Sequence, residues 1–207
     1  MFVNISILFS LETMKFSIDL SYQTPPEWAH HALEDFDAFL QDHADCERKA
    51  SAMAMSFVAK CPDRTEIIPE LIETAIEELE HFQSVYELMQ KRGVELKKEM
   101  EQDEYMHQLI ALCRSGRDDR LMDRMLLASI VECRGAERFK LISDALEDEQ
   151  LKRFYKMLWT SEAKHGNIFV KMALEYWPEK DVYERLHELT NQEGEICKNL
   201  KWRSALH

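Results

Sequence analysis

The sequence has 207 residues, and its 26 Lys and Arg against 39 Asp and Glu give a formal net charge of −13. With 45% hydrophobic and 31% charged residues, and no apolar stretch long enough for a membrane span, the composition excludes a disordered chain and a membrane protein. Only 5 Gly and 5 Pro are present, too few for the turns of an all-β fold. The 5 Cys form no CxxC pair, which is typical of a reducing compartment and indicates a cytoplasmic protein.

The first residues precede any regular hydrophobic pattern. The opening MFVNISILFSLET has no Lys or Arg before Lys15 and no small-residue cleavage site after it, so it does not have the features of a signal peptide. We expect residues 1–15 to form a disordered extension, with Met14 as an alternative start of translation. Residues 16–207 are then expected to form a single domain.

Hydrophobic residues recur at 3.6-residue spacing along four segments, which predicts four long helices over about 25–60, 66–93, 118–145 and 148–177. A connector over 93–117 contains a short helical piece at 101–113. A more polar last helix, at about 181–203, is expected to pack on the outside. The pattern predicts an all-α four-helix bundle with an accessory crossover helix and a C-terminal helix.

Each of the four hydrophobic stripes carries a Glu at its middle, where a core helix is normally apolar: Glu47, Glu78, Glu132 and Glu162. An unpaired ionised carboxylate in a core is so costly that it would normally take up a proton. Two of these Glu are followed three residues later by a His, His81 and His165, on the same helix face.

The four Glu are also expected to lie at matching heights in the bundle. Glu47 lies 14 residues before its turn and Glu78 13 residues after it, while Glu132 and Glu162 each lie 14 residues from theirs. At about 1.5 Å per residue, each Glu is roughly 20 Å from its turn. Three further ExxH matches lack a stripe Glu at the corresponding distance upstream, and we expect them on solvent-exposed faces: Glu27–His30, Glu104–His107 and Glu184–His187.

Two explanations compete for the four Glu. They are either separate core residues satisfied by Arg or by helix-capping bonds, or ligands of a shared pair of metal ions. No Arg lies in the stripes between them, which favours the metal site. One Glu from each of two helices plus ExxH from each of the other two is the di-iron carboxylate arrangement. Carboxylates with two imidazoles suit iron or manganese, whereas zinc sites normally use fewer carboxylates.

Neighbouring residues have less specific interpretations. His43, one turn before Glu47, is expected to be a buried core histidine, with a contact to the metal ligand as the alternative. Glu137 is rotated by about 140° from Glu132 around the helix, so we expect it outside the ligand set. Cys46 and Cys133 are expected to be small core fillers. Tyr155 is expected to be a core aromatic, with electron transfer as the alternative.

Four segments together resemble one protein family. DHADCERKAS (42–51), ELEHF (78–82), IVECRGAERF (130–139) and SEAKHGNIF (161–169) are similar to motifs of the tRNA-(2-methylthio-N6-isopentenyladenosine) hydroxylases, the MiaE family, and the resemblance extends over about 16–205. It implies that six residues are the ligands and catalytic residues of an oxo- or hydroxo-bridged di-iron centre: Glu47, Glu78, His81, Glu132, Glu162 and His165.

The resemblance further implies that the four-helix bundle is ferritin-like, and that the protein carries out O2-dependent hydroxylation of the isopentenyl group on a modified adenosine in the anticodon region of tRNA. Two electrons must then come from outside, because the sequence has no flavin motif, CxxC pair or iron–sulfur spacing. A ferredoxin or a reductase is therefore an expected partner, and we expect no membrane association.

Two other functions use similar ligands. A ferritin-like iron-storage protein with ferroxidase activity would assemble into a shell, whereas we expect a monomer or a small oligomer, which gel filtration distinguishes. A di-iron quinone hydroxylase would need a membrane-facing apolar helix, and the segment 181–203 is too polar for that. A rubrerythrin-type peroxidase usually carries a four-cysteine module, which the sequence lacks.

An RNA substrate would have to meet a local basic surface on this acidic chain. Two clusters are candidates, although a solvated helix surface explains each of them equally well: Lys91, Arg92, Lys97 and Lys98, and Lys198, Lys201 and Arg203. If the second cluster contacts phosphate, replacing its three cations by Gln should weaken tRNA binding and reduce its salt dependence.

Overall fold

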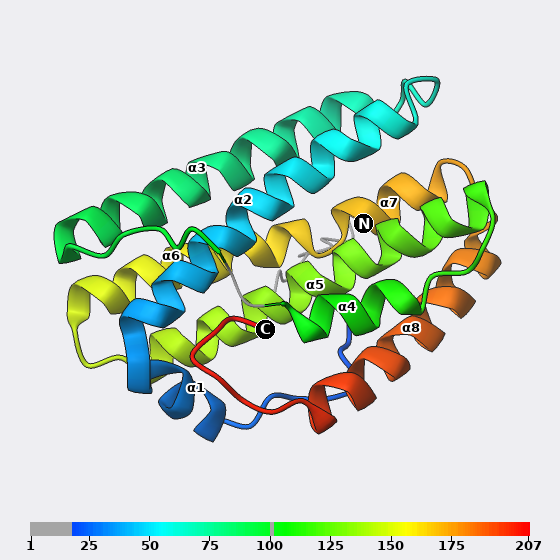
Figure 1. Ribbon diagram of the computed structural model, residues 1–207. Coiled ribbons are helices and arrows are strands. Elements are labelled where there is room, and N and C mark those ends of the chain that lie inside the picture. Colours follow the sequence, from blue (N-terminus) through cyan, green and yellow to red (C-terminus); the bar gives the residue numbers. More distant parts are fainter. Residues whose placement is uncertain (1–17, 100–101) are drawn as a thin grey trace, which may run out of the picture.

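The computed structural model describes residues 18–99 and 102–207, so the predicted extension over 1–15 lies outside the described residues. Within that part the chain is all-helical, as the hydrophobic pattern predicts. Eight α-helices and one short 3-10 helix follow in this order (Figure 1): α1 (Glu27–Ala32), η1 (Leu33–Asp35), α2 (Phe36–Lys60), α3 (Ile68–Arg92), α4 (Glu104–Ala111), α5 (Arg117–Ala145), α6 (Glu149–His165), α7 (Ile168–Leu174) and α8 (Glu179–Asn199).

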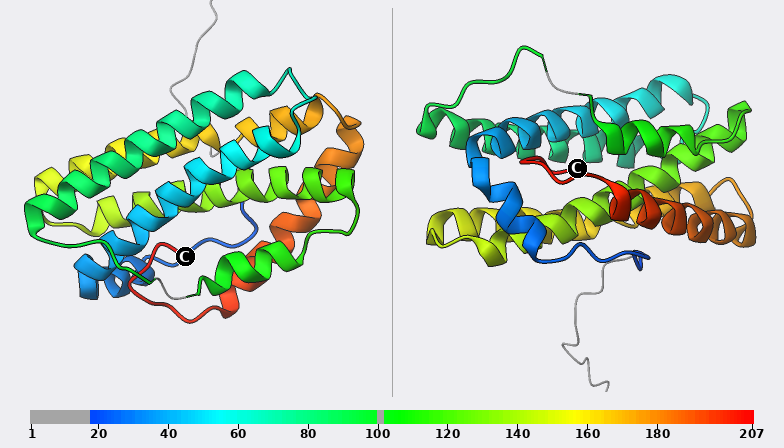
Figure 2. Two further views of the ribbon diagram at one scale, coloured as in Figure 1. Left: turned by 45° about the horizontal axis from the view of Figure 1, so that its top comes forward. Right: turned by 60° about the horizontal axis from the view of Figure 1, so that its bottom comes forward.

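Two long antiparallel hairpins form the bundle. α2 packs along α3, and α5 packs along α6 and its continuation α7 (Figures 1 and 2). Helix α3 ends where Gly93 adopts a left-handed conformation with φ 72°, which glycine adopts without steric cost. Asp148 caps the start of α6, where its side chain accepts hydrogen bonds from the backbone N–H groups of Gln150 and Leu151.

The accessory helices cover one side of this bundle. The crossover helix α4 packs against the last helix α8, and α8 packs against α5 (Figure 2). As predicted, α8 packs on the outside, but its inner face is buried and carries two charged residues, Arg185 and Glu193. The last residues turn back toward α2, where the Leu206 backbone N–H donates to Asp42 at 2.8 Å.

Two predicted long helices are interrupted. The segment expected as one helix over 25–60 is divided into α1, η1 and α2, and Asp35 caps α2 by accepting from the Ala38 N–H. The segment expected over 148–177 breaks at Gly166 and Asn167, two poor helix formers. After this second break, the Val170 N–H has no acceptor within its own helix and donates to the Ser129 hydroxyl at 3.1 Å. The second break follows His165 directly.

The apolar core falls into two clusters along the bundle. One contains Phe57, Leu71 and Met125, and the other contains Phe39 and Phe139. On α2, Glu47 lies between Phe39 and Phe57. The predicted Glu positions therefore lie in the middle of the bundle, between two apolar layers. No helix of the described residues is both long and apolar enough to cross a membrane.

Candidate metal centre

All six side chains singled out in the sequence meet in the middle of the bundle. Their ligand atoms form two groups that share two carboxylates, and within each group the atoms lie within 4.8 Å of one another: Glu47, Glu78, His81 and Glu162, and Glu78, Glu132, Glu162 and His165. Two overlapping groups with two common carboxylates have the geometry of two neighbouring cation positions. If two metal ions bind, Glu78 and Glu162 would be within reach of both, because they belong to both groups.

Each of the four central helices contributes one carboxylate, from near the midpoint of α2, α3 and α5 and from the last turn of α6, which ends at His165. Glu47 comes from α2, Glu78 from α3, Glu132 from α5 and Glu162 from α6, and all four are buried. The heights predicted from the spacing therefore match in the structure. By contrast, the His side chains of the other three ExxH matches are exposed, on α1, α4 and α8: His30, His107 and His187.

Both histidines direct Nδ1 toward the carboxylates and Nε2 away from them. His81 Nδ1 lies 2.8 Å from Glu162 Oε1, and His165 Nδ1 lies 3.0 Å from Glu78 Oε1. On the outer side, His81 Nε2 lies 3.2 Å from the Ser161 hydroxyl, and His165 Nε2 contacts the Glu77 carboxylate. Such outer contacts orient an imidazole and fix which nitrogen carries the proton, so that the other is free for a metal.

Polar atoms without hydrogen-bond partners concentrate in the cluster. Apart from the ion pairs that they form with one another, both carboxylate oxygens of Glu78 and of Glu162, and Nδ1 of His81 and of His165, are buried and have no hydrogen-bond partner. Buried polar atoms are normally paired, because an unpaired one loses its hydration without compensation. Six such atoms converging on one place fit metal ligands, and the donor set of carboxylates and imidazoles fits iron or manganese.

The electrostatics of the cluster also favour the binding of cations. Burial and the charges of the neighbouring carboxylates raise the pKa of Glu47 and of Glu132 well above the usual range. Burial alone would lower the pKa of the histidines, but contacts with the carboxylates outweigh it. They raise the pKa of His81 to about 10 and that of His165 to about 12. The site therefore binds positive charge strongly, whether protons or metal ions neutralise it.

Other buried carboxylates in the protein are neutralised differently. Asp123 pairs with Arg185 at 3.0 Å, and Glu193 pairs with Arg134 at 2.8 Å. Glu137, predicted to lie outside the ligand set, contacts Arg134 and accepts hydrogen bonds from Thr24. No Lys or Arg of the described residues pairs with the four central Glu, so the structure does not support the Arg-satisfied explanation for them.

His43 is both a buried core histidine and a contact of Glu47, the two interpretations that the sequence leaves open. It is fully buried, and its Nε2 lies 2.7 Å from Glu47 Oε1 while its Nδ1 lies 3.2 Å from the Tyr155 hydroxyl. Burial lowers the pKa of His43 to about 3, so the ring is neutral. With Glu47 ionised, Nε2–H donates to Glu47 and Nδ1 accepts from Tyr155. His43 therefore holds the Glu47 carboxylate in one orientation.

Replacing His43 by Phe should lower metal affinity or turnover by about 10- to 100-fold, because Glu47 loses its orienting donor. The Phe ring keeps the aromatic packing against Phe139, whose centroid lies 4.5 Å from that of His43. Tyr155→Phe serves as the control, since it leaves the contact with Glu47 intact and should have a smaller effect. Metal titration of both variants tests this, and equal losses would contradict it.

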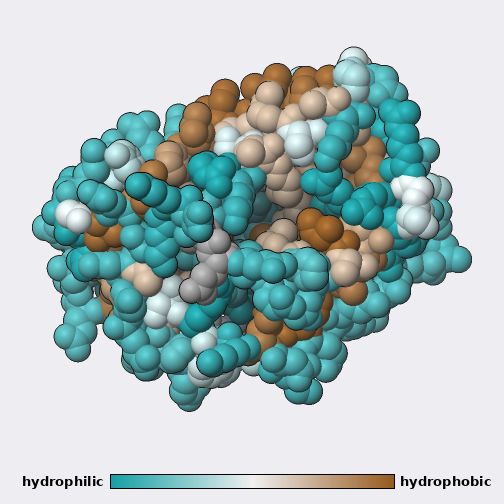
Figure 3. Space-filling view, viewed as in Figure 1, coloured by the Kyte–Doolittle hydropathy of each residue, from teal (hydrophilic) through white to brown (hydrophobic). Residues whose placement is uncertain are grey.

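A cavity of about 310 Å³ leads from the cluster toward the surface. Glu47, Glu78, Glu132 and Glu162 lie in its wall, and it runs between α2, α4 and α5. In Figure 3, apolar side chains gather on this face in the region between α2 and α4. The remaining wall also contains the cations of Lys49 and Arg124. Most of it is formed by apolar side chains: Met53, Met106, Ile110, Val131, Phe139 and Leu206.

Sequence reasoning has no means of finding several of these residues. Glu77 and Ser161 are polar residues beside the predicted ligands, and nothing in their spacing shows that they contact the rings of His165 and His81. The cavity wall likewise comes from separate helices and from the chain end. Its one sequence signal is the presence of Met residues, which often line adaptable pockets.

The fold and the buried cluster define a ferritin-like helical protein whose bundle core can hold metal ions. A solved structure from Synechococcus, described as Protein 43 with aldehyde deformylating oxygenase activity, is similar with a TM-score of 0.85 and 30% identity, covering 91% of this chain and 94% of that one. The sequence model described as tRNA-(MS[2]IO[6]A)-hydroxylase (MiaE) matches residues 12–207. The chain belongs to this family.

Two curated relatives carry a corresponding name, tRNA 2-(methylsulfanyl)-N(6)-isopentenyladenosine(37) hydroxylase. The protein from Pseudomonas putida is 36% identical over 180 residues, which are 87% of this chain and 87% of that protein. The protein from Salmonella typhimurium is 28% identical over 131 residues, 63% of this chain and 47% of that protein. The family resemblance predicted from four short motifs is thereby confirmed over most of the chain.

Proposed function

We propose that this protein is an O2-dependent di-iron monooxygenase that hydroxylates the isopentenyl group of 2-methylthio-N6-isopentenyladenosine in tRNA, in the cytoplasm. Family membership supports the substrate class. The observation that carries the proposal is the mostly apolar cavity that ends at the four buried carboxylates. An iron-storage site needs no such substrate cavity.

The chain's own residues perform two tasks in this proposal. Six of them would hold the two iron ions, which supply O2 activation when bound: Glu47, Glu78, His81, Glu132, Glu162 and His165. The cavity wall binds the isopentenyl group by burying its apolar surface and excludes water from the site. Since the sequence contains no redox motif of its own, an external donor such as a ferredoxin or a reductase supplies the two electrons.

Nucleoside analysis of tRNA tests the substrate directly. Cells lacking the protein should lose the hydroxylated nucleoside and accumulate its unhydroxylated precursor. The wild-type protein should restore it, and a Glu132→Ala variant should not. If the amount of hydroxylated nucleoside is unchanged in cells without the protein, the proposed substrate is wrong. This result would not contradict the proposed metal site.

Filling the cavity at Gly135 should reduce turnover without removing metal. Gly135 lies one turn after Glu132 in the cavity wall, and an added Cβ would meet no atom within 4 Å. A Leu at this position would extend into the space for the substrate and should lower kcat/KM by about tenfold or more.

Gly135→Ala is the matched control. It fits the open space and should raise stability by up to about 1 kcal/mol, because Ala favours a helix over Gly. Steady-state kinetics, metal analysis and thermal unfolding separate the effects. Unchanged kinetics in Gly135→Leu would show that the substrate does not occupy this cavity.

A further inference from the structure

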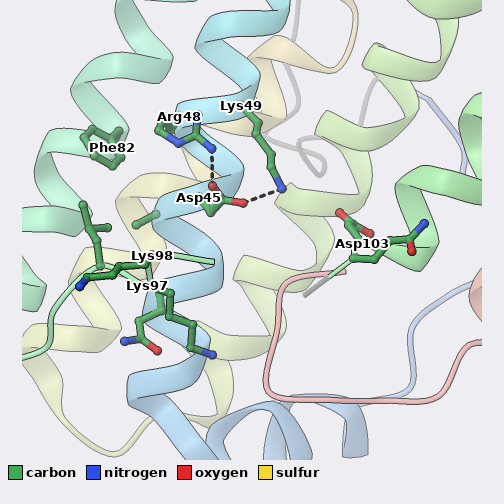
Figure 4. Close-up of a pocket in the computed structure, with 11 residues that line it drawn as sticks. Asp45, Arg48, Lys49, Phe82, Lys97, Lys98 and Asp103 are labelled. Atoms are coloured by element: carbon green, nitrogen blue, oxygen red, sulfur yellow. Dashed lines mark hydrogen bonds and ion pairs between the residues drawn. The ribbon is translucent and has the colours of Figure 1, made fainter. Parts of the chain in front are cut away.

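A second, larger cavity lies directly beside the one that reaches the carboxylates. It has a volume of about 540 Å³ and lies between α2 and the connector that follows α3 (Figure 4). We call it the basic groove, after the charged residues in its wall: Asp45, Arg48, Lys49, Lys97, Lys98 and Asp103. Phe82 and Leu96 give it an apolar side.

The basic groove has surplus positive charge in a protein whose net charge is −13. Its two carboxylates already have partners. Asp45 lies 2.5 Å from Arg48 and 2.5 Å from Lys49. Both contacts are drawn as dashed lines in Figure 4. Asp103 caps α4 by accepting a hydrogen bond from the Met106 N–H. Lys97 and Lys98 are exposed and form no ion pair with any described residue. The groove therefore offers free cations to an anionic ligand.

The groove and the cavity at the metal cluster share part of their walls. Lys49 and Asp103 line both, and Lys49 lies two residues after Glu47 on α2. If the isopentenyl group of a nucleoside enters the cavity, the phosphates of the RNA strand that carries this nucleoside would therefore lie next to the groove. Lys97 and Lys98 lie on the other side of α2 from Asp103, so they extend the groove away from the cavity (Figure 4).

We propose that the basic groove binds the phosphodiester backbone of the RNA strand beside the nucleoside being hydroxylated. The proposal rests on the proposed function and adds where the polynucleotide lies. Arg48 contacts Asp45 through one nitrogen and its side chain is 56% exposed, so the rest of its guanidinium is open to hydrogen bonds with a phosphate, while the lysines act as point charges. This is the local basic surface that an RNA-binding protein with so many acidic residues needs.

Salt-dependent binding tests the groove. The double variant Lys97→Gln/Lys98→Gln is compared with Lys156→Gln/Lys164→Gln, which removes the same charge from exposed positions on α6 that line neither cavity. The probe is an anticodon stem–loop RNA carrying the substrate nucleoside. The groove variant should reduce the slope of log K against log salt by roughly 0.7–0.9 for each phosphate that is no longer neutralised, and the α6 control should not.

Further measurements keep the outcomes separate. Metal content and turnover of the free nucleoside should be unchanged in the groove variant, since neither lysine contacts the cluster. Lys97→Glu/Lys98→Glu should weaken RNA binding further than the Gln variant. Wild-type protein that leaves the RNA unhydroxylated would contradict the proposed function. Wild-type hydroxylation together with the same slope in groove variant and control would overturn the groove alone.

Discussion

Glu132→Ala should lose metal and abolish hydroxylation. Glu132 is buried, lies in the same group as Glu78, Glu162 and His165, and has no Lys or Arg partner among the described residues. The variant lacks one of the carboxylates that would bind the two cations, so the amount of metal bound per chain should fall by at least about half. Metal analysis and single-turnover product formation measure the effect.

Glu137→Ala is the control for this prediction, since both residues are buried Glu side chains on α5. Glu137 contacts Arg134 and Thr24 instead of the cluster, so its removal should leave the metal content unchanged and lower the stability. If Glu137→Ala loses metal while Glu132→Ala keeps it, the assignment of the two carboxylates is reversed.

The largest stability loss is expected at Arg134, which is fully buried on α5. Its guanidinium contacts Glu193 through two nitrogens, at 2.8 and 2.9 Å, and also contacts Glu137 and the Tyr22 carbonyl. Arg134→Met leaves two buried carboxylates without a cation, a loss of about 3–5 kcal/mol. At about 2–4 °C per kcal/mol for a chain of this size, the Tm should fall by roughly 10 °C.

Adding Glu193→Gln to Arg134→Met tests the cause. The second substitution removes one uncompensated charge, so the double variant should recover part of the decrease in Tm. Metal content should stay at the wild-type value in both, because neither residue lies at the cluster. A Tm within about 2 °C of wild type for Arg134→Met would show that the network contributes little.

The four Glu and two His can be found from the sequence because each breaks an apolar stripe at a predictable height. A buried charge on a hydrophobic face is a strong local signal, and Glu137, rotated off that face, is correctly separated from Glu132. Their matching heights follow from the rise per residue of a helix, whereas their meeting within 4.8 Å also requires the two hairpins to pack against each other. Their role as iron ligands stays a proposal.

The remaining features depend on tertiary contacts that no spacing encodes. The last helix is merely polar in its sequence, yet its Glu193 is fully buried because Arg134 of α5 neutralises it. The sequence does not reveal the break after His165, because the apolar periodicity continues through Gly166 and Asn167 while the backbone does not. Likewise, Lys49 and Lys97 are far apart in the sequence and line one groove only because the connector returns to α2.

Metal analysis of the purified wild-type protein tests the central claim most directly. Two overlapping groups of ligands sharing Glu78 and Glu162 predict about two iron ions per chain, with the near-ultraviolet absorption of a bridged diferric centre. One iron per chain, or stoichiometric zinc with no iron-dependent activity, would contradict the account.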